Sequence, residues 1–338
     1  MAPNILIGIV LTLTGGVIVG NCMVPLKFAR TWAWENMWMV FNIFSLILIP
    51  WALAFGTIPD VTGIYTALGV GPMVVPFLFG FGWGIAQVLF GLAVVRLGMS
   101  LGFAIVVGLG AMLGSLVPLL VQHREVLGTT KGGIILCGVA AMLAGIAVCA
   151  LAGRRRDRAA AAGGLNLPGA YRTGLLIAVC SGLLAPMLNY ALAFGDAIAA
   201  EAMRQGASAA NASYAVWPVG LLGGFIPNIA YSAYLLTRNK TWSRFRRPLP
   251  DFSLGALMGL LWMGSVAIYG VGATYLGPLG TSVGWALFQI FMIMTANVSG
   301  LIAGEWRGAA RQPVRVLYAG LAVLTLATAV ISYGNSVP

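Results

Sequence analysis

The chain of 338 residues is 60% hydrophobic and only 8% charged, and it carries a formal net charge of +11. A soluble domain has roughly 25% charged residues, so this composition excludes a protein that folds alone in water and predicts an integral membrane protein. The mean hydropathy is +0.94, and apolar runs recur along the whole length, which excludes a single membrane anchor.

A helix needs about 20 predominantly apolar residues to cross a bilayer, and ten runs of this chain reach that length. Barrel strands are not expected, because they show alternating polarity over about 10 residues, whereas these runs are apolar on all sides. The predicted fold class is therefore an all-α integral membrane protein with ten transmembrane helices, and a tight turn at Arg96 joins the third to the fourth. The predicted spans are residues 4–24, 34–55, 74–95, 98–121, 132–152, 172–194, 212–236, 253–274, 282–304 and 314–333.

The first span leads through a short basic segment into the stretch WAWENMW at residues 32–38. This first run lacks a basic leader and is too long for the apolar core of a signal peptide, so we expect it to stay in the protein. Trp32, Trp34 and Trp38 lie where the chain enters the second span, and tryptophan prefers that interface. An aromatic belt explains the tryptophans but does not explain Glu35 among them.

The four cysteines, Cys22, Cys137, Cys149 and Cys180, all fall inside predicted spans. We interpret them as small packing residues and not as a disulfide framework or a metal site. The sequence accordingly predicts no cofactor and no bound metal ion.

Basic residues predict the orientation of the chain. All but three of the 19 Lys and Arg residues lie in loops that follow odd-numbered spans, and the exceptions are Arg124, Lys131 and Arg204. The side richer in Lys and Arg faces the cytoplasm by the positive-inside rule, so both termini are predicted to be periplasmic. The net charge of +11 then reflects topology, and no nucleic-acid partner is expected.

Similar residues recur in the two halves of the chain. Trp83 and Trp262 align at an offset of 179 residues, and Glu35 aligns with Glu201 at an offset of 166. Because each half has an odd number of spans, the halves must be inverted relative to each other, which is a recurrent way to build transporters. The predicted organisation is a five-helix repeat in residues 1–152, a basic cytoplasmic linker in residues 153–171 and a second five-helix repeat in residues 172–338.

Several motifs together resemble one family of membrane transporters. They are WAWENMW at 32–38, PWA at 50–52, PFLFGFGWGI at 76–85, RLGMSLG at 96–102, EW at 305–306 and RQPVRVL at 311–317. With these residues the chain resembles the L-rhamnose–proton symporter family, within the drug/metabolite transporter superfamily. The resemblance implies ten helices in two inverted repeats in the bacterial inner membrane, and uptake of a deoxyhexose with a proton by alternating access. The family has asparagines at the positions of Gln87 and Leu89, so one amide is kept here and the other is lost.

Sugar hydroxyls pair with amides and carboxylates, and sugar faces stack on aromatic rings. Gln87, one helical turn from Trp83, is the best single amide candidate. Packing beside glycines is the alternative for the tryptophans, and hydrogen bonding between helices is the alternative for the other amides. The candidate substrate-binding residues are Trp83, Gln87, Trp262, Asn42, Asn189, Asn228, Gln289 and Asn297.

A proton carrier needs a group that gains and loses a proton during the cycle. The candidates for proton coupling or gating are Glu35, Glu201, Asp196 and Glu305. Glu35 and Glu201 are expected at opposite mouths of a central cavity, and the alternatives for Glu35 are a helix-end charge or a gate that pairs with Lys27 or Arg96. The single histidine, His123, is interpreted as a solvated residue of an outer loop.

Two other function classes stay open. One is a transporter or exporter of another polar metabolite, which shares all of the features above. The remote alternative is an intramembrane enzyme, because GTSVG at 280–284 matches the Gly-x-Ser-x-Gly nucleophile pattern. That pattern requires a strand–turn–helix context, whereas here it begins a membrane span. The expected partners are a sugar, a proton and membrane lipid, and the oligomeric state is left open.

Overall fold

The computed structural model describes residues 4–160, 168–246, 250–307 and 309–337. Within these ranges the chain forms helices and turns but no strand, as expected where lipid leaves the backbone no partner outside its own helix. Ten helical spans are long and apolar enough to cross a membrane, which confirms the predicted number. They are Ile5–Phe28, Trp34–Thr57, Gly71–Leu97, Leu101–Gln122, Thr130–Arg156, Tyr171–Arg204, Ala212–Arg238, Asp251–Tyr275, Gly280–Ile302 and Arg311–Ser336.

Several spans consist of more than one helical element. In chain order the elements are α1 (Ile5–Asn21), η1 (Val24–Phe28), α2 (Trp34–Ile43), η2 (Phe44–Leu48), α3 (Ile49–Thr57), α4 (Val61–Leu68), α5 (Gly71–Leu97), α6 (Met99–Gln122), η3 (Arg124–Gly128), α7 (Thr130–Ala160), α8 (Pro168–Leu184), α9 (Met187–Ala193), α10 (Asp196–Arg204), η4 (Ala212–Ala215), α11 (Trp217–Arg238), η5 (Trp242–Arg246), α12 (Asp251–Tyr275), α13 (Gly280–Ile302) and α14 (Arg311–Ser336).

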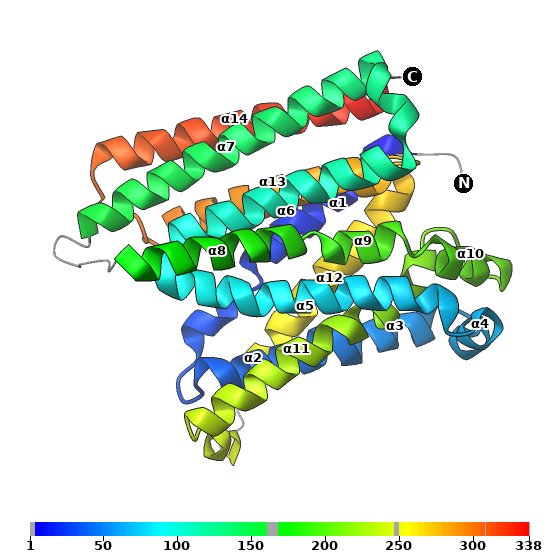
Figure 1. Cartoon of the computed structure of the whole chain (residues 1–338), viewed down its shortest axis with the longest axis horizontal. Helices are drawn as coiled ribbons and strands as arrows, with labels where there is room; N and C mark the ends of the chain where they lie inside the picture. The colour runs from blue at the N-terminus through cyan, green and yellow to red at the C-terminus, as the bar shows by residue number, and fades with distance from the viewer. Residues whose placement is uncertain (1–3, 161–167, 247–249, 308, 338) are drawn as a thin grey trace.

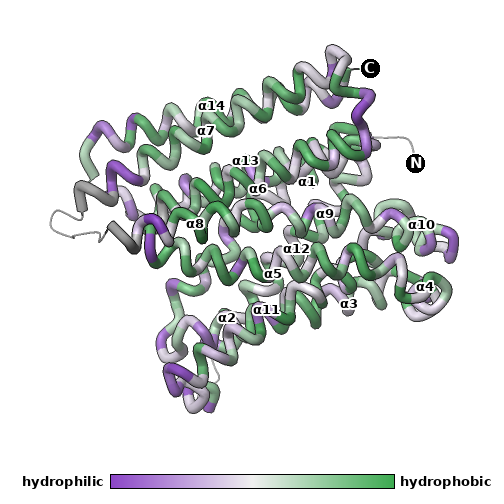
Figure 2. Tube along the Cα trace, viewed as in Figure 1, coloured by the Kyte–Doolittle hydropathy of each residue, from purple (hydrophilic) through white to green (hydrophobic). Residues whose placement is uncertain are grey.

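The long helices run side by side, and the loops gather at two opposite ends of the bundle (Figure 1). Both termini lie at one end, together with α4 and α10. The end of α7 and the start of α8 lie at the other end, as do the ends of α11 and α13 and the starts of α12 and α14; we call it the basic end. The helix shafts are mainly hydrophobic, and hydrophilic segments lie mostly near the ends (Figure 2), as a bilayer requires. The linker predicted at 153–171 lies partly outside the described residues.

Two spans expected to be single helices are interrupted. In the second span a π-helical turn, η2, separates α2 from α3, with Pro50 just after it. In the sixth span α8 ends at Leu184 and α9 begins after Pro186, because proline lacks the N–H that a continuous helix needs. The tight turn between the third and fourth spans is made by Gly98, with φ of 81°, so Arg96 lies in the last turn of α5 and not in the turn itself.

Close helix contacts are made through small residues. A Cβ added to Gly80 on α5 would collide with the backbone of Gly220 on α11, and a Cβ on Gly84 would collide with Gly224. Glycine at these places lets the two helix backbones touch, which is how membrane helices gain van der Waals contact. Gly80 and Gly84 lie four residues apart in the GFGWG motif at 80–84, so both face α11 from the same side of α5.

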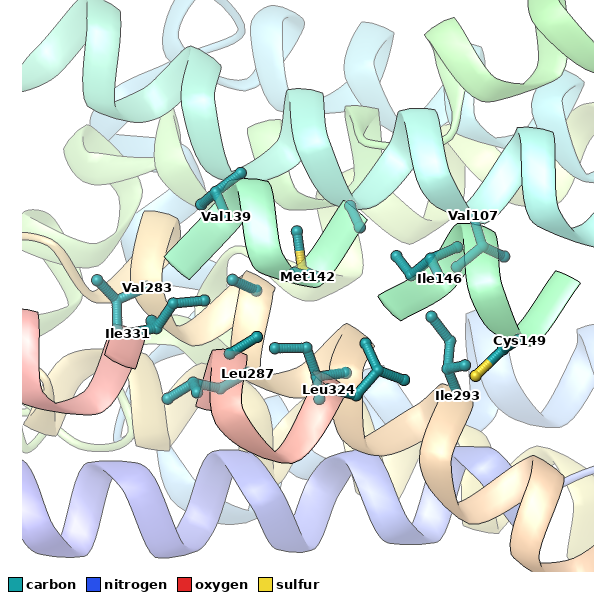
Figure 3. Packing of buried hydrophobic residues seen from close by; sticks show 14 of the residues in the cluster. Val107, Val139, Met142, Ile146, Cys149, Val283, Leu287, Ile293, Leu324 and Ile331 are labelled. Atoms are coloured by element: carbon teal, nitrogen blue, oxygen red, sulfur yellow. The ribbon is translucent and has the colours of Figure 1, made fainter. Parts of the chain in front are cut away.

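The pair α7 and α14 packs on α6 and α13 through a core of aliphatic side chains (Figure 3). Met142, Ile146 and Leu324 belong to this core. The cysteine prediction is only half right, because Cys22 and Cys149 are buried whereas Cys137 and Cys180 are exposed on the outside of the bundle. All four are free thiols.

Candidate functional site

A cavity of about 630 Å³ lies at the end of the bundle that carries the termini. It is formed where the ends of α6, α9, α12 and the start of α13 meet α10 and η4, so both halves of the chain contribute. Its lining residues are Gln122, His123, Leu192, Ala193, Asp196, Ala199, Met203, Ala209, Ala212, Ser213, Val216, Gly270, Ala273, Thr274, Gly277, Pro278 and Thr281. Its size falls in the range of roughly 300–1,000 Å³ that is typical of small-molecule pockets.

Two buried polar atoms, one on a residue that lines this cavity and one behind its wall, have no hydrogen-bond partner among the described residues. They are the Ser213 Oγ of η4 and the Trp217 Nε1 at the start of α11. Gly270 of α12 faces both, since a Cβ added there would lie 3.0 Å from the Ser213 Oγ and 3.1 Å from the Trp217 Nε1. A buried polar atom without a partner costs about 1–3 kcal/mol, so the Ser213 hydroxyl, which lines the cavity, is suited to bind a polar ligand there.

A tight hydrogen-bond cluster supports this part of the cavity. The Asn189 Nδ2 donates to the carbonyl oxygens of Gly114 at 2.9 Å and Thr281 at 3.0 Å, and its Oδ1 accepts from the Tyr269 hydroxyl. These contacts join α9 to α6, α13 and α12. Because both ends of the Asn189 amide are engaged within the protein, this predicted substrate-binding residue acts here as a link between helices.

Two titratable side chains line the cavity wall. Asp196 is the first residue of α10 and is exposed, and His123 follows the last residue of α6. The expectation that His123 is simply solvated is wrong in this respect, because its imidazole is half-buried and lines the cavity. Its Nδ1 lies 3.5 Å from the Glu125 Oε1. Asp196 is the one predicted proton-coupling residue that lines this cavity, whereas Glu305 lines a second cavity at the basic end.

Trp83 and Trp262 stack on each other with ring centroids 5.3 Å apart and planes 26° apart, which confirms their expected proximity. The stack continues toward the basic end. Phe41 lies 6.2 Å from Trp262, Trp38 lies 4.8 Å from Phe41, and Trp34 lies 5.0 Å from Trp38. Of the three tryptophans in WAWENMW, Trp38 therefore belongs to an internal aromatic column and Trp34 is exposed at its end. Trp32 is buried separately, against Phe245 and Phe252.

The other predicted amides are dispersed. Asn228 accepts from the Trp38 Nε1 and donates to backbone carbonyls, so it fixes the aromatic column. Asn42 is buried and its Nδ2 has no partner among the described residues. Gln289 is buried on α13, Gln87 is half-buried on α5, and Asn297 lines a second cavity at the basic end. The structure does not bring these amides together into one site.

Glu35 is buried at the basic end and is fully engaged. Its Oε1 accepts from the Thr241 hydroxyl at 2.7 Å and from the Asn239 Nδ2 at 3.1 Å. These partners belong to the loop after α11, so Glu35 ties the two halves together. Lys27 pairs with Glu305 instead, so the partners expected for a Glu35 gate, Lys27 and Arg96, are not those in the structure.

Asp251 makes a parallel connection at the same end. Its buried carboxylate accepts from the backbone N–H groups of Arg30, Thr31 and Trp32 at 2.7–3.0 Å, and from the Thr31 hydroxyl. The loop between the first two spans is thus bound to the start of α12. Together, Glu35 and Asp251 with these partners form what we call the inner latch.

Glu201 and Glu305 each form an ion pair near the surface. Glu201 pairs with Arg204 three residues later on α10 and accepts from Gln205, and Glu305 pairs with Lys27. Glu35 and Glu201 were expected at opposite mouths of a central cavity. Neither residue is among those that line the two cavities described here. GTSVG at 280–284 lies in the first turns of α13, which is not a strand–turn–helix.

Sequence reasoning missed Ser213, Trp217 and Gly270. Trp217 stands next to Pro218, where a helix is expected to begin, so it resembles an interfacial tryptophan in the sequence. Only the folded chain shows that it is almost fully buried and that its N–H is left unpaired. For Gly270 the sequence did offer one indication, since this glycine aligns with Gly91 of the first half at an offset of 179 residues.

Ten apolar helices with a partly polar cavity between the ends of both halves define a membrane transport protein. The chain belongs to the L-rhamnose-proton symport protein family, which it matches over residues 1–337. It is 30% identical over 350 residues to the L-rhamnose-proton symporter of Yersinia pestis (strain Pestoides F). It is 29% identical over 345 residues to the L-rhamnose-proton symporter of Mannheimia succiniciproducens. Each comparison covers 99% of this chain and 99% of the relative. Membership of a symporter family confirms that this chain is a transporter and not an enzyme.

Proposed function

We propose that this protein imports L-rhamnose together with a proton across the bacterial inner membrane by alternating access. The observation that carries the proposal is the match to one symporter family along the whole chain, and the relatives named above bear the name L-rhamnose-proton symporter. The structure adds a cavity between the halves at one end and a latch at the other. This arrangement fits a carrier that is open toward the end with the termini.

We infer that the ten spans form two inverted five-helix repeats of the drug/metabolite transporter type, in residues 1–152 and 172–338. The packing pairs support this. In the first half α1 packs on α12 and α13, and in the second half α8 packs on α5 and α6. In the same way, α5 of the first half packs on α11 of the second half, and α12 of the second half packs on α2 of the first half. Exchanging the halves maps each pair onto its counterpart, as a twofold axis would, and α1 and α8 run in opposite directions (Figure 1).

The end with the termini is proposed to face the periplasm. Most Lys and Arg residues lie in the segments at the opposite end, and the positive-inside rule places that end in the cytoplasm. The cavity lined by Asp196 then opens to the side from which a nutrient arrives. The inner latch closes the cytoplasmic side.

We propose that the sugar binds against Ser213, Trp217 and Gly270. The Trp217 N–H can donate to a sugar hydroxyl, and the Ser213 hydroxyl can donate or accept. Leu192, Val216 and Ala273 also line the cavity. A deoxyhexose differs from a hexose by a methyl group in place of a hydroxymethyl group, and an apolar wall favours that methyl group because no hydroxyl is left unpaired on it.

The predicted tryptophan pair takes an inner position in this proposal. Trp83 and Trp217 belong to one buried cluster, so Trp83 and Trp262 lie beneath the proposed site and not at its mouth. Gln87 follows Trp83 by one turn on the same helix. These residues are proposed to form the path that the sugar takes when the inner end opens, with Asn42 as the unpaired amide beside it.

Asp196 is proposed as the proton carrier. It is exposed in the cavity, whereas Glu35, Glu201 and Glu305 each have partners within the protein. A carboxylate on the cavity wall can take a proton from the outer solution while the sugar binds a few side chains away. His123, on the same wall, would help to set the protonation of Asp196.

Uptake by the purified protein in liposomes tests the proposal. With an acidic outer solution, labelled L-rhamnose should accumulate above its outer concentration, and a protonophore should abolish that accumulation. L-Mannose, which carries the extra hydroxyl, should be taken up more slowly. Saturable uptake that ignores the pH gradient would contradict proton coupling. If L-rhamnose shows no saturable uptake while another polar metabolite does, the proposed substrate is wrong.

A further inference from the structure

The second span changes its helical hydrogen bonding halfway along. α2 ends in the π-helical turn η2 (Phe44–Leu48), and α3 follows. The backbone N–H of Ile49 donates to the carbonyl oxygen of Phe44, five residues earlier, and Pro50 next to it has no N–H to donate. π-helical turns and prolines are the places where helices usually bend. The second span is therefore expected to bend at η2 more easily than elsewhere.

The two parts of this span are held at different ends of the molecule. α2 carries Glu35 of the inner latch, and the next residue, Asn36, donates from its Nδ2 to the carbonyl oxygen of Thr241 at 3.1 Å. At the end with the termini, Ala54 of α3 and Ile58 just after it are buried in a core with side chains of α4 and α10. Release of the latch would therefore free α2 and leave α3 in place.

α12 packs on α2 and η2 partly through glycine. A Cβ added to Gly259 of α12 would lie 2.7 Å from the Phe44 Cβ and 3.1 Å from the Ser45 backbone nitrogen. A Cβ added to Gly255 would lie 3.1 Å from the Val40 side chain. Because glycine has no side chain to interlock with its neighbour, α2 can move away from this part of α12 without drawing side chains out of a packed core.

Asn42 lies in the last turn of α2, directly before the π-helical turn, and it is only 1% exposed. Its Nδ2 has no hydrogen-bond partner among the described residues, although an unpaired polar group is costly at membrane depth. Bending a helix lengthens the hydrogen bonds on its outer side and turns carbonyl oxygens outward. The free N–H groups of Asn42 are therefore placed to pair with a backbone carbonyl oxygen that a bend at η2 exposes.

We propose that η2 is the hinge of the inner gate. When the inner latch releases, α2 swings away from α12 about η2 while α3 keeps its place, and Asn42 stabilises the bent form. Asn42 is then a positioning residue, since it acts on the helix and not on the sugar. The inference rests on the proposed alternating access, because it describes how the cytoplasmic end opens, but it does not depend on which sugar is carried.

Distances between spin labels on the purified protein test the hinge without any sugar. In a cysteine-free background, one pair of labels replaces Trp34 on α2 and Leu257 on α12, and a reference pair replaces Phe55 on α3 and Leu260 on α12; all four positions are exposed. Glu35→Ala releases part of the latch, so it should add a population of longer distances to the first pair and leave the reference pair unchanged. If the first pair gains no longer distance, or if both pairs change alike, the span stays closed or moves as one rigid helix, and the proposal is wrong.

Removal of the π-helical turn tests whether the bend lies at η2. A π-helical turn holds one residue more than an α-helical turn, so deletion of the exposed Leu48 should make the span a continuous α-helix and remove the longer distances of the Glu35→Ala protein. Pro50→Ala restores one backbone N–H at the hinge and should reduce the longer distances about fivefold, as expected for one hydrogen bond. Pro76→Ala within α5, a helix that carries no latch residue, should not. Longer distances that persist in the Leu48 deletion, or equal effects of the two proline variants, would overturn the hinge, and the proline pair decides if the deletion variant does not fold.

Asn42→Leu separates a role in bending from a role in packing. Leucine has the same branched shape but cannot donate to a carbonyl oxygen, so the longer distances of the Glu35→Ala protein should decrease about fivefold. The melting temperature should not fall, because the Asn42 Nδ2 makes no hydrogen bond in the latched form. Asn228→Leu, which loses hydrogen bonds to Trp38 and Gly224, should lower it. A fall as large as that of Asn228→Leu, with unchanged distances, would show that Asn42 only packs. Neither sugar nor a pH gradient is present, so failure of the hinge and failure of the transport proposal are distinguishable.

Discussion

Ser213, which lines the cavity at the end with the termini, and Trp217 behind it distinguish this cavity from an ordinary gap between helices. Their polar atoms are buried and unpaired among the described residues, and Gly270 packs so closely against them that an added Cβ would lie within 3.1 Å of both. In the proposed complex the sugar supplies the missing partners. Binding would then remove the free-energy cost of the two unpaired polar atoms, and it would also form new hydrogen bonds.

Gly270→Ala tests the proposed sugar site by adding a single methyl group beside Ser213 and Trp217. The added methyl group would lie 3.0–3.1 Å from both polar atoms, so it should push them out of position and weaken L-rhamnose binding about tenfold, which corresponds to one hydrogen bond. Isothermal titration of the purified protein measures this. Gly264→Ala is the matched control, because it lies on the same helix with nothing within 4 Å of the added Cβ. Equal affinities in both variants would argue against the proposed site.

Asp196→Asn tests proton coupling. The amide keeps the shape of the side chain but cannot carry a proton, so accumulation driven by a pH gradient should be lost. Exchange of labelled for unlabelled L-rhamnose across the liposome membrane should persist, since it needs no net proton movement. Glu201→Gln, which alters a local ion pair on the same helix, should keep both activities. Normal accumulation by the Asp196 variant would show that another group carries the proton.

At the scale of elements, the inner latch joins α2 to the loop after α11 through Glu35, and it joins the loop before α2 to the start of α12 through Asp251. Buried carboxylates are costly unless they are well paired, and Glu35 and Asp251 are paired across the two halves. To release sugar into the cytoplasm, the protein must separate these loops. In the proposed orientation, the latch would bias the resting protein toward the outward-open state.

Asp251→Asn should weaken the latch. The charged carboxylate accepts from backbone N–H groups and from a hydroxyl, and losing charge-assisted bonds costs roughly 1–3 kcal/mol. The melting temperature in detergent should fall by several degrees. Asp60→Asn is the control, because Asp60 caps α4 on the exposed surface and asparagine caps a helix equally well. An equal fall in the melting temperature of the Asp60→Asn variant would point to a general loss of stability and not to a weakened latch.

Hydropathy and turn residues predicted most of the elements but not their contacts. The ten spans follow from apolar length alone, because lipid enforces helices, and the close packing at Gly80 and Gly84 follows from their spacing. The cavity could not be predicted, because it depends on where η4, α10 and the end of α12 meet. Glu35 was recognised as unusual in the sequence, but its partner Thr241 lies 206 residues away.

At the scale of the whole molecule, the bundle has one end rich in basic residues and one end with the termini (Figures 1 and 2). Cysteines placed at Ser336 and Ser243, both exposed and at opposite ends, can be labelled with an impermeant thiol reagent after the native cysteines are replaced. In intact right-side-out cells, position 336 should react and position 243 should not. The reverse pattern would invert the proposed topology and put the Asp196 cavity on the cytoplasmic side.

The central claim is that the cavity between the two halves admits the sugar from outside. Thr274 is exposed on the cavity wall, one turn beyond Gly270 on α12. Thr274→Cys in the cysteine-free background should react with an impermeant thiol reagent, and saturating L-rhamnose should slow that reaction several-fold. Thr66→Cys, exposed on α4 at the same end, should react at a rate that L-rhamnose does not change. A Thr274→Cys reaction equally fast with and without L-rhamnose would contradict the account.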